Sequence, residues 1–219
     1  MAIHLQRDLQ DLRKELLLLG TMVETAINQA IVALNSRRPE LADKVIADGD
    51  AIDKKEVFIE ESCLKILALH QPVAIDLRFI VVVLKVNNDL ERMGDFAENI
   101  AERAKFLSTQ PGIPLPNDFS NIMSQQLRDM IRMALDSLVN LDIDQARRVI
   151  KMDKVIDDIN RNMYQELQKL MMEDSSTVER AIQYLSSSRY MERIGDLATN
   201  IAEDVIFMVE GRVVRHQAL

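Results

Sequence analysis

The chain has 219 residues, of which 47% are hydrophobic and 4% aromatic, and its formal net charge is -8 at pH 7. This length allows one large domain or two small ones. The acidic balance argues against binding to nucleic acid, because there is no basic surplus to displace counterions from a phosphate backbone. The single cysteine, Cys63, excludes an internal disulfide framework and fits a reducing compartment. Charged residues interrupt the first turns and no stretch approaches 18 uncharged apolar residues, so we expect a cytoplasmic, soluble protein.

Three helices are predicted in the first half, over residues 4–36, 39–69 and 73–107. Pro39 stands where a first-turn proline starts a helix, and Gln71-Pro72 ends that helix. We expect the second helix to bend at residues 48–50, Asp-Gly-Asp. Residues 79–84 are rich in β-branched side chains and could form a strand. No turn separates them from the helical pattern that follows, so they are assigned to the third helix.

Three more helices are predicted in the second half, over residues 118–140, 144–172 and 176–210. Asp144 and either Ser175 or Ser176 are the expected N-cap residues, and Gly211 is the expected residue after the last helix. The segment between the two halves contains Gln-Pro-Gly-Ile-Pro-Leu-Pro, the densest cluster of helix breakers in the chain.

The two halves repeat each other. The phrase Glu91–Glu102 recurs as Glu192–Glu203, with nine of twelve positions identical. We therefore expect a first repeat over residues 1–108, a linker over 109–117 and a second repeat over 118–219. Three long helices joined by short links form a bundle. The predicted fold is all-α, with two tandem three-helix bundles related by a pseudo-twofold axis.

The repeated phrase carries a stripe of polar residues on one side of its helix. Glu91, Asp95, Asn99 and Glu102 share a face in the first repeat, opposite the apolar residues, and their counterparts share one in the second. Carboxylates stacked four residues apart repel by a few tenths of a kcal/mol per pair. A polar face exposed to water is the ordinary explanation of such a stripe. The residue types on such a face are expected to vary freely between the repeats, as they do where Glu98 is replaced by Thr199. The four stripe positions keep their residue types, which favours a role in binding a cation.

Each phrase also keeps a glycine in mid-helix, Gly94 and Gly195, at a cost of about 1 kcal/mol relative to alanine. Close packing by a neighbouring helix is the favoured explanation. The second helices supply further acids: Asp153 and Asp157 in the second repeat, and Asp53, with Asp50, in the first. If the second and third helices are neighbours, these acids meet the stripe. Four converging carboxylates without basic partners favour a hard cation that prefers oxygen ligands: Fe, Mn, Mg or Ca.

Other chemistries have weaker support. The three histidines His4, His70 and His216 are isolated, which argues against a histidine-based zinc site. Cys63 lies among aliphatic residues and is predicted to be a buried, inert thiol. No glycine-rich phosphate loop is present. The arginine pairs 37–38 and 147–148 are predicted to be surface residues at helix bends.

Three segments resemble the PhoU family of accessory proteins of the phosphate-specific ABC transport system: DLERMGDFAENIAE (89–102), RYMERIGDLATNIAE (189–203) and ALHQPVAIDLR (68–78). The resemblance implies a cytoplasmic negative regulator of phosphate uptake and of phosphate-starvation signalling. It implies contacts with the transporter's ATPase subunit and a sensor histidine kinase, a homodimer, and membrane association only through partners. It also implies a metal cluster in each bundle, with iron favoured and Mn, Mg, Zn, Ni or Ca as alternatives.

By position, the resemblance assigns two ligand sets: Asp50, Asp53, Glu91 and Asp95 in the first repeat, and Asp153, Asp157, Glu192 and Asp196 in the second. Gly49 replaces an expected acid, so the first site is expected to bind more weakly. Phe96 and Leu197 stand where many relatives carry histidine, which favours an all-oxygen ligand shell.

Three functional hypotheses follow. The first is a metal-binding regulatory adaptor without catalytic turnover, and hence not an enzyme. The second is a metal-independent structural adaptor whose acids meet basic residues of a partner. The third is a metallohydrolase acting on phosphate compounds, although no general acid, nucleophile or substrate pocket is visible in the sequence.

Overall fold

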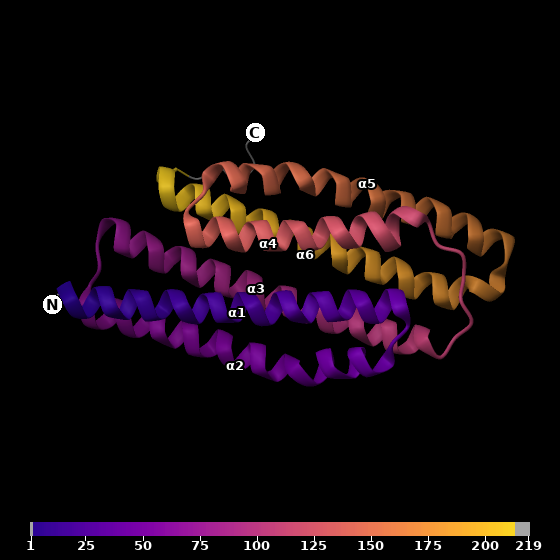
Figure 1. The fold of residues 1–219 in the computed structure, drawn as a ribbon, viewed down its shortest axis with the longest axis horizontal. Coiled ribbons are helices and arrows are strands. Elements are labelled where there is room, and N and C mark those ends of the chain that lie inside the picture. Colours follow the sequence, from indigo (N-terminus) through magenta and orange to yellow (C-terminus); the bar gives the residue numbers. More distant parts are fainter. Residues whose placement is uncertain (1, 213–219) are drawn as a thin grey trace.

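The structure is a computed structural model and describes residues 2–212, with side chains from His4 onward. Within that range it contains helices and no strand, as predicted (Figure 1). The first repeat consists of α1 (Ala2–Ser36), α2 (Pro39–His70) and α3 (Ala74–Ser108). The second begins with a short π-helical turn, η1 (Asp118–Met123), followed by α4 (Ser124–Asn140), α5 (Ile143–Glu173), a 3₁₀ turn, η2 (Ser175–Thr177), and α6 (Val178–Glu210). Residues 109–116 form no helix.

The six long helices run along the longest axis of the molecule as two bundles lying against each other (Figure 1). In each bundle the third helix of the repeat packs against the other two. The bundles meet through α3 and α6, which run in opposite directions, and through α1 and α4 (Figure 1). Corresponding helices therefore face each other across the interface, as the expected pseudo-twofold arrangement requires.

The interior is one continuous aliphatic core that extends through both bundles. On α3, the predicted inner face is buried, because Leu90, Met93 and Ile100 are each 0% exposed. The β-branched residues 79–84 lie within α3, so their assignment to helix is confirmed. Tertiary burial of an apolar face outweighs the modest helix propensity of these residues.

Helix ends follow the sequence signals in part. Pro39 occupies the first turn of α2, and Gly211 ends α6 at a φ of 75°, both as predicted. The predicted N-caps were wrong. Asp142, rather than Asp144, accepts a hydrogen bond from the Gln145 backbone nitrogen at 2.9 Å. Asp174, rather than either serine, accepts one from the Ser176 nitrogen at 2.9 Å. Asp174 comes directly after α5, and Leu141 alone separates Asp142 from α4, so the connections are shorter than the sequence suggested. α2 continues through residues 48–50 without interruption.

Polar contacts reinforce the interface between the bundles. Lys85 Nζ lies 2.7 Å from Oδ1 of Asp204, a residue that is only 2% exposed. The Phe96 and Tyr190 rings stack with centroids 5.7 Å apart, and the Arg103 guanidinium lies 5.5 Å from the Tyr190 centroid. α3 and α6 are thus joined by a buried ion pair as well as by apolar packing.

Arg37 holds the linker against the first bundle. It lies at the end of α1, is half-buried, and donates through Nη2 to the carbonyl oxygens of Leu107 and Gln110. The prediction that Arg37 is a plain surface residue was therefore wrong. Its neighbour Arg38 is exposed and pairs with Glu40 at 3.1 Å.

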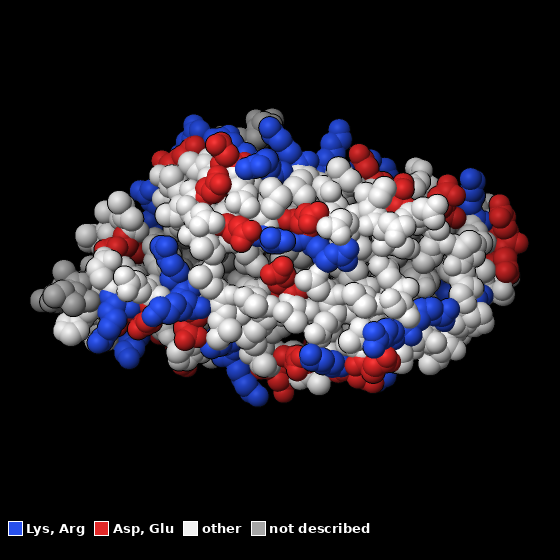
Figure 2. Space-filling view, viewed as in Figure 1, with Lys and Arg blue, Asp and Glu red and all other residues white. Residues whose placement is uncertain are grey.

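α1 is long and apolar enough to cross a membrane by length and composition, but half of that apolar stretch is buried inside the protein. The same composition is expected of a core helix in a bundle. Acidic and basic side chains are interspersed on the face where α1 and α4 lie in front (Figure 2), so neither charge forms a continuous surface there.

The two neighbouring arginines give a matched test of the linker contact. Arg37→Gln should lower the free energy of unfolding by about 1–3 kcal/mol, because two partly buried carbonyl groups lose charged donors. Arg38→Gln should change it by less than about 0.5 kcal/mol, since its ion pair is exposed. Urea unfolding of the full chain measures both. Equal effects would show that the linker does not depend on Arg37.

Candidate metal centres on the second and third helices of each repeat

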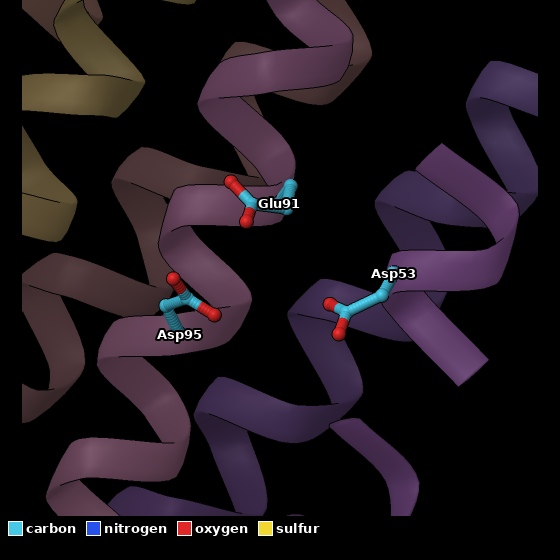
Figure 3. A group of neighbouring side chains, drawn as sticks. All are labelled: Asp53, Glu91 and Asp95. Atoms are coloured by element: carbon cyan, nitrogen blue, oxygen red, sulfur yellow. The ribbon is translucent and has the colours of Figure 1, made fainter. Parts of the chain in front are cut away.

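Three carboxylates from two helices converge in the first repeat. Asp53 lies on α2, while Glu91 and Asp95 lie one turn apart on α3. Each offers an oxygen that lies within 4.8 Å of an oxygen of the other two. Figure 3 shows Glu91 and Asp95 on successive turns of α3, with Asp53 opposite them on α2. Among the described residues, this is the one group of three potential ligands that meets this spacing.

The glycine in mid-helix allows α2 to approach. A Cβ atom on Gly94 would lie 3.1 Å from Cγ2 of Ile52, closer than ordinary van der Waals contact. Ile52 is buried against this gap, and the next residue, Asp53, is thereby held beside the stripe of α3. The explanation of Gly94 by helix packing is confirmed, and the packing also positions a carboxylate.

A fourth carboxylate, Glu98, lies near the first cluster at a position that the sequence analysis did not assign to it. A Cβ atom on Gly49 would lie 2.9 Å from Oε2 of Glu98, so Glu98 occupies the space that a side chain at position 49 would need. Burial raises the pKa of Glu98, and the charges of Glu102, Asp95, Asp53 and Asp50 raise it further. The charge of Asp50 acts on Glu98, and both residues lie outside the group of three.

Among the residues that the structure describes, arginines do not neutralise the first cluster. Burial, and then the charges of Asp95, Glu56 and Asp53, raises the pKa of Glu91. Arg92 lowers that pKa, but as the smallest contribution. The pKa of Asp95 is also raised, by burial and then by Asp53. Glu102, farther along the stripe, pairs instead with Arg103.

The second cluster is more deeply buried. The pKa of Asp153 is raised from its ordinary value of 3.8 to about 7, first by burial and then by Asp157, Asp196 and Glu192. Its Oδ1 atom is buried and has no hydrogen-bond partner. That atom would lie 3.2 Å from a Cβ atom on Gly195, so the second glycine makes room for a carboxylate. All four predicted acids therefore act on one another in this repeat.

The two repeats exchange the position of one acid. By alignment Gly49 corresponds to Asp153, and Glu98 corresponds to Thr199. The first repeat thus supplies a carboxylate from the third helix, into the space beside Gly49. The second repeat supplies one from the second helix, into the space beside Gly195. The difference between Glu98 and Thr199, which looked like free variation in sequence, is paired with the difference between Gly49 and Asp153.

Sequence reasoning missed a pair of residues behind the first cluster. Glu56 lies one turn beyond Asp53, and its pKa is raised by burial and then by Glu60 and Asp53. Asn87 donates to the Glu56 carbonyl oxygen at 3.0 Å and to Oε1 at 3.4 Å. The equivalent pair in the second repeat is neutral, with Ser188 donating to Oδ1 of Asn160 at 2.8 Å. Comparing the repeats could not reveal Glu56, because its counterpart carries no charge.

The remaining candidates lie apart from these clusters. Cys63 is fully buried and its pKa is raised to about 12, which agrees with an inert thiol. His70 Nε2 lies 2.9 Å from Oδ2 of Asp8, and His216 lies outside the described residues. Phe96 packs on Tyr190, and Leu197 is buried in the core. Asn99 donates its amide to the Asp95 carbonyl oxygen at 2.8 Å.

The pKa of Asp153 predicts a pH dependence of stability. A carboxyl whose pKa is higher in the folded state resists ionisation there, so the metal-free fold loses stability as pH rises from about 4 to about 7. Asp153→Asn should remove about 1–2 kcal/mol of that loss, after allowance for solvent screening. Urea unfolding with a chelator at about pH 5 and about pH 8 measures the difference. Asp158→Asn is the control, since Asp158 is exposed and pairs with Arg161 at 2.8 Å. A D153N variant with the wild-type pH dependence would contradict this account.

Known proteins match this chain over nearly its whole length. A family model described as the PhoU domain matches twice, at residues 16–104 and 121–205. A phosphate-specific transport system accessory protein PhoU homolog from Aquifex aeolicus is 38% identical over 96% of this chain and 95% of its own. The accessory protein PhoU of Escherichia coli is 34% identical over 95% of this chain and 86% of its own.

Solved structures agree with the sequence matches. The crystal structure of PhoU from Pseudomonas aeruginosa superposes with a TM-score of 0.92 at 38% identity, covering 94% of this chain and 99% of that one. The PhoU structure from Streptococcus pneumoniae gives a TM-score of 0.87 at 27% identity, covering 96% and 99%. Both repeats, the full length and the fold therefore agree, and the chain belongs to the PhoU family.

Proposed function

We propose that this protein is a cytoplasmic accessory protein of the phosphate-specific transport system that lowers phosphate uptake and represses phosphate-starvation signalling. The observation that carries the proposal is the match of both repeats, over nearly the full chain, to relatives with that name. As an adaptor without turnover, it acts by contacts with the transporter's ATPase subunit and with a sensor histidine kinase.

We propose further that each acidic cluster holds metal. In the first repeat Asp53, Glu91 and Asp95, with Glu98, would supply the oxygen atoms. In the second repeat Asp153, Asp157, Glu192 and Asp196 would supply them. The donor set fits a hard cation, because it consists of carboxylates whose pKa values are raised by burial and mutual repulsion. A bound cation would neutralise this charge and tie the second helix of each repeat to the third. Iron is favoured, with Mn, Mg, Zn, Ni or Ca as alternatives.

Metal analysis of protein purified without chelator tests this proposal. The wild-type protein should carry at least one equivalent of metal per repeat, and added Fe or Mn should raise its melting temperature. The double variants Asp53→Asn/Asp95→Asn and Asp157→Asn/Asp196→Asn should each lose the metal of one repeat. In the absence of metal, these variants should melt at or above the melting temperature of the metal-free wild type, because the repulsion between carboxylates has been reduced. Less than one equivalent per chain, with melting unaffected by Fe or Mn, would reject the metal sites.

The exchanged acid provides a sharper control for the same measurement. Glu98→Thr should weaken the first site, and adding Gly49→Asp to that variant should restore it, because this recreates the arrangement of the second repeat. Asp158→Asn should leave metal content unchanged. Failure of the double exchange to restore metal would show that Glu98 is not part of the site.

Regulation itself is tested in cells. Deleting the gene should switch on a phosphate-starvation reporter in phosphate-rich medium and raise phosphate uptake, and the wild-type chain should reverse both effects. The variant lacking both metal sites should fail to reverse them if the metal completes a docking surface. A deletion that leaves the reporter and the uptake unchanged would contradict the proposed role.

A further inference from the structure

One end of the first bundle exposes a cluster of aliphatic side chains, which we call the apolar tip. It surrounds the turn between α2 and α3 and comprises Leu69, Val73, Ile75 and Leu77, which are 63%, 74%, 71% and 41% exposed. Isolated exposed aliphatics are common, but a contiguous apolar patch on a protein surface marks an interaction site.

The second repeat shows that this turn does not need aliphatic residues. At the positions equivalent to Val73 and Ile75 it carries Asp174 and Ser176. Asp174 caps the turn by accepting from the Ser176 nitrogen at 2.9 Å. The same connection is therefore built with polar, capping side chains at the other end of the molecule. Val73 and Ile75 are therefore not required by the fold, although the position of Leu77 is aliphatic in the second repeat as well, where it is Val178.

The backbone of the tip is also strained. Gln71 and Ala74 have φ values of 47° and 49°, in the left-handed region that disfavours residues with a side chain. The corresponding residues of the second repeat, Met172 and Ser175, are not among the described non-glycine residues with positive φ. Strained backbone concentrates at binding sites because the strain holds side chains in place.

An apolar hollow adjoins the tip between the two bundles. It has a volume of about 540 Å³ and is bordered by Leu9, Arg13, Ile75, Phe79, Leu141 and Met208. α1, α3, α6 and the turn after α4 therefore all contribute walls, with Ile75 common to the tip and the hollow. The combination offers a convex knob beside a concave groove, which suits an amphipathic helix.

The charges around the hollow are mainly basic. The Arg13 guanidinium lies 5.2 Å from the Phe79 ring centroid and makes no ion pair or hydrogen bond with a described residue. Arg78 donates to the Met208 carbonyl oxygen at 3.2 Å, and Asp76 is the one acid that borders the hollow among the described residues. In the second repeat the position of Arg78 is taken by Glu179. Two arginines, Arg13 and Arg78, and one acid, Asp76, therefore border the hollow beside the apolar tip.

We propose that the apolar tip and its hollow dock an amphipathic helix of a partner protein, which packs aliphatic side chains on Val73 and Ile75 and places a carboxylate beside Arg13. The nature of the partner rests on the proposed function, under which it is a cytoplasmic protein of the phosphate transport system. The location of the surface rests on the tip itself.

Exchange of residues between the repeats tests the surface without disturbing the fold. The variant Val73→Asp/Ile75→Ser gives the first tip the residues of the second. Val73 is the N-cap of α3, where aspartate is favoured, so the variant should fold at least as well as the wild type. Its binding to the purified ATPase subunit should be at least about tenfold weaker. Arg13→Gln should weaken binding less and reduce its dependence on salt. Met172→Gln, at the exposed other end, should leave affinity unchanged.

The alternatives give different results. Unchanged affinity of the V73D/I75S variant for the subunit would overturn the proposal. Two other results would also overturn it. One is that the wild-type chain binds phosphatidylglycerol vesicles and the V73D/I75S variant does not. The other is that the wild-type chain self-associates in sedimentation and the variant does not. If the purified subunit does not bind the wild-type chain, a photo-crosslinking residue placed at position 75 tests the surface in cells. An adduct with another protein of the phosphate transport system supports the surface, and no such adduct overturns it. The starvation reporter tests the proposed function separately.

Discussion

Close packing of the second helix on the third brings like charges together in both repeats, and the candidate sites depend on it. Gly94 and Gly195 remove the side chains that would hold these helices apart, and Ile52 and Asp153 occupy the space. Glycine in a helix costs about 1 kcal/mol, and each pair of stacked acids adds a few tenths of a kcal/mol. The fold accepts both costs at equivalent places, although most proteins are stable by only about 5–15 kcal/mol in total. An unfavourable arrangement built twice in this way indicates a compensating interaction with something outside the chain.

Neutralisation within the chain does not explain the arrangement. Arg92 and Arg193 lower the pKa values of neighbouring acids, yet the pKa values of Glu91, Glu192 and Asp196 remain raised because burial and the other carboxylates outweigh them. In the first repeat, Glu102 at the end of the stripe pairs with Arg103, away from Glu91 and Asp95. A cation is the economical compensation, since one ion can interact with all the carboxylates of a cluster at once.

The sequence predicts features that depend on local pattern and fails where the outcome depends on a distant contact. Helical periodicity and the repeated phrase were enough to predict the helices, the two bundles and the acids that converge. Glu98 could not be assigned to the first cluster, because its place depends on the space left by Gly49 on another helix. Arg37 was misassigned for the same reason, since its acceptors lie far along the chain on Leu107 and Gln110. Glu56 was missed because its neutral counterpart hides it from the comparison of repeats.

The comparison of repeats also separates two kinds of surface. The acidic clusters keep their charge in both halves, even where the residue that supplies it moves from one helix to the other, so the constraint acts on the site as a whole. The ends of the bundles share a connection of the same kind, yet the exposed Val73 and Ile75 of one end are replaced by Asp174 and Ser176 at the other. Pseudo-symmetry would make a two-bundle protein present equivalent ends to any partner. Differing ends remove that ambiguity, so a partner that selects the apolar tip would bind in one orientation and would meet the two acidic clusters in a fixed order.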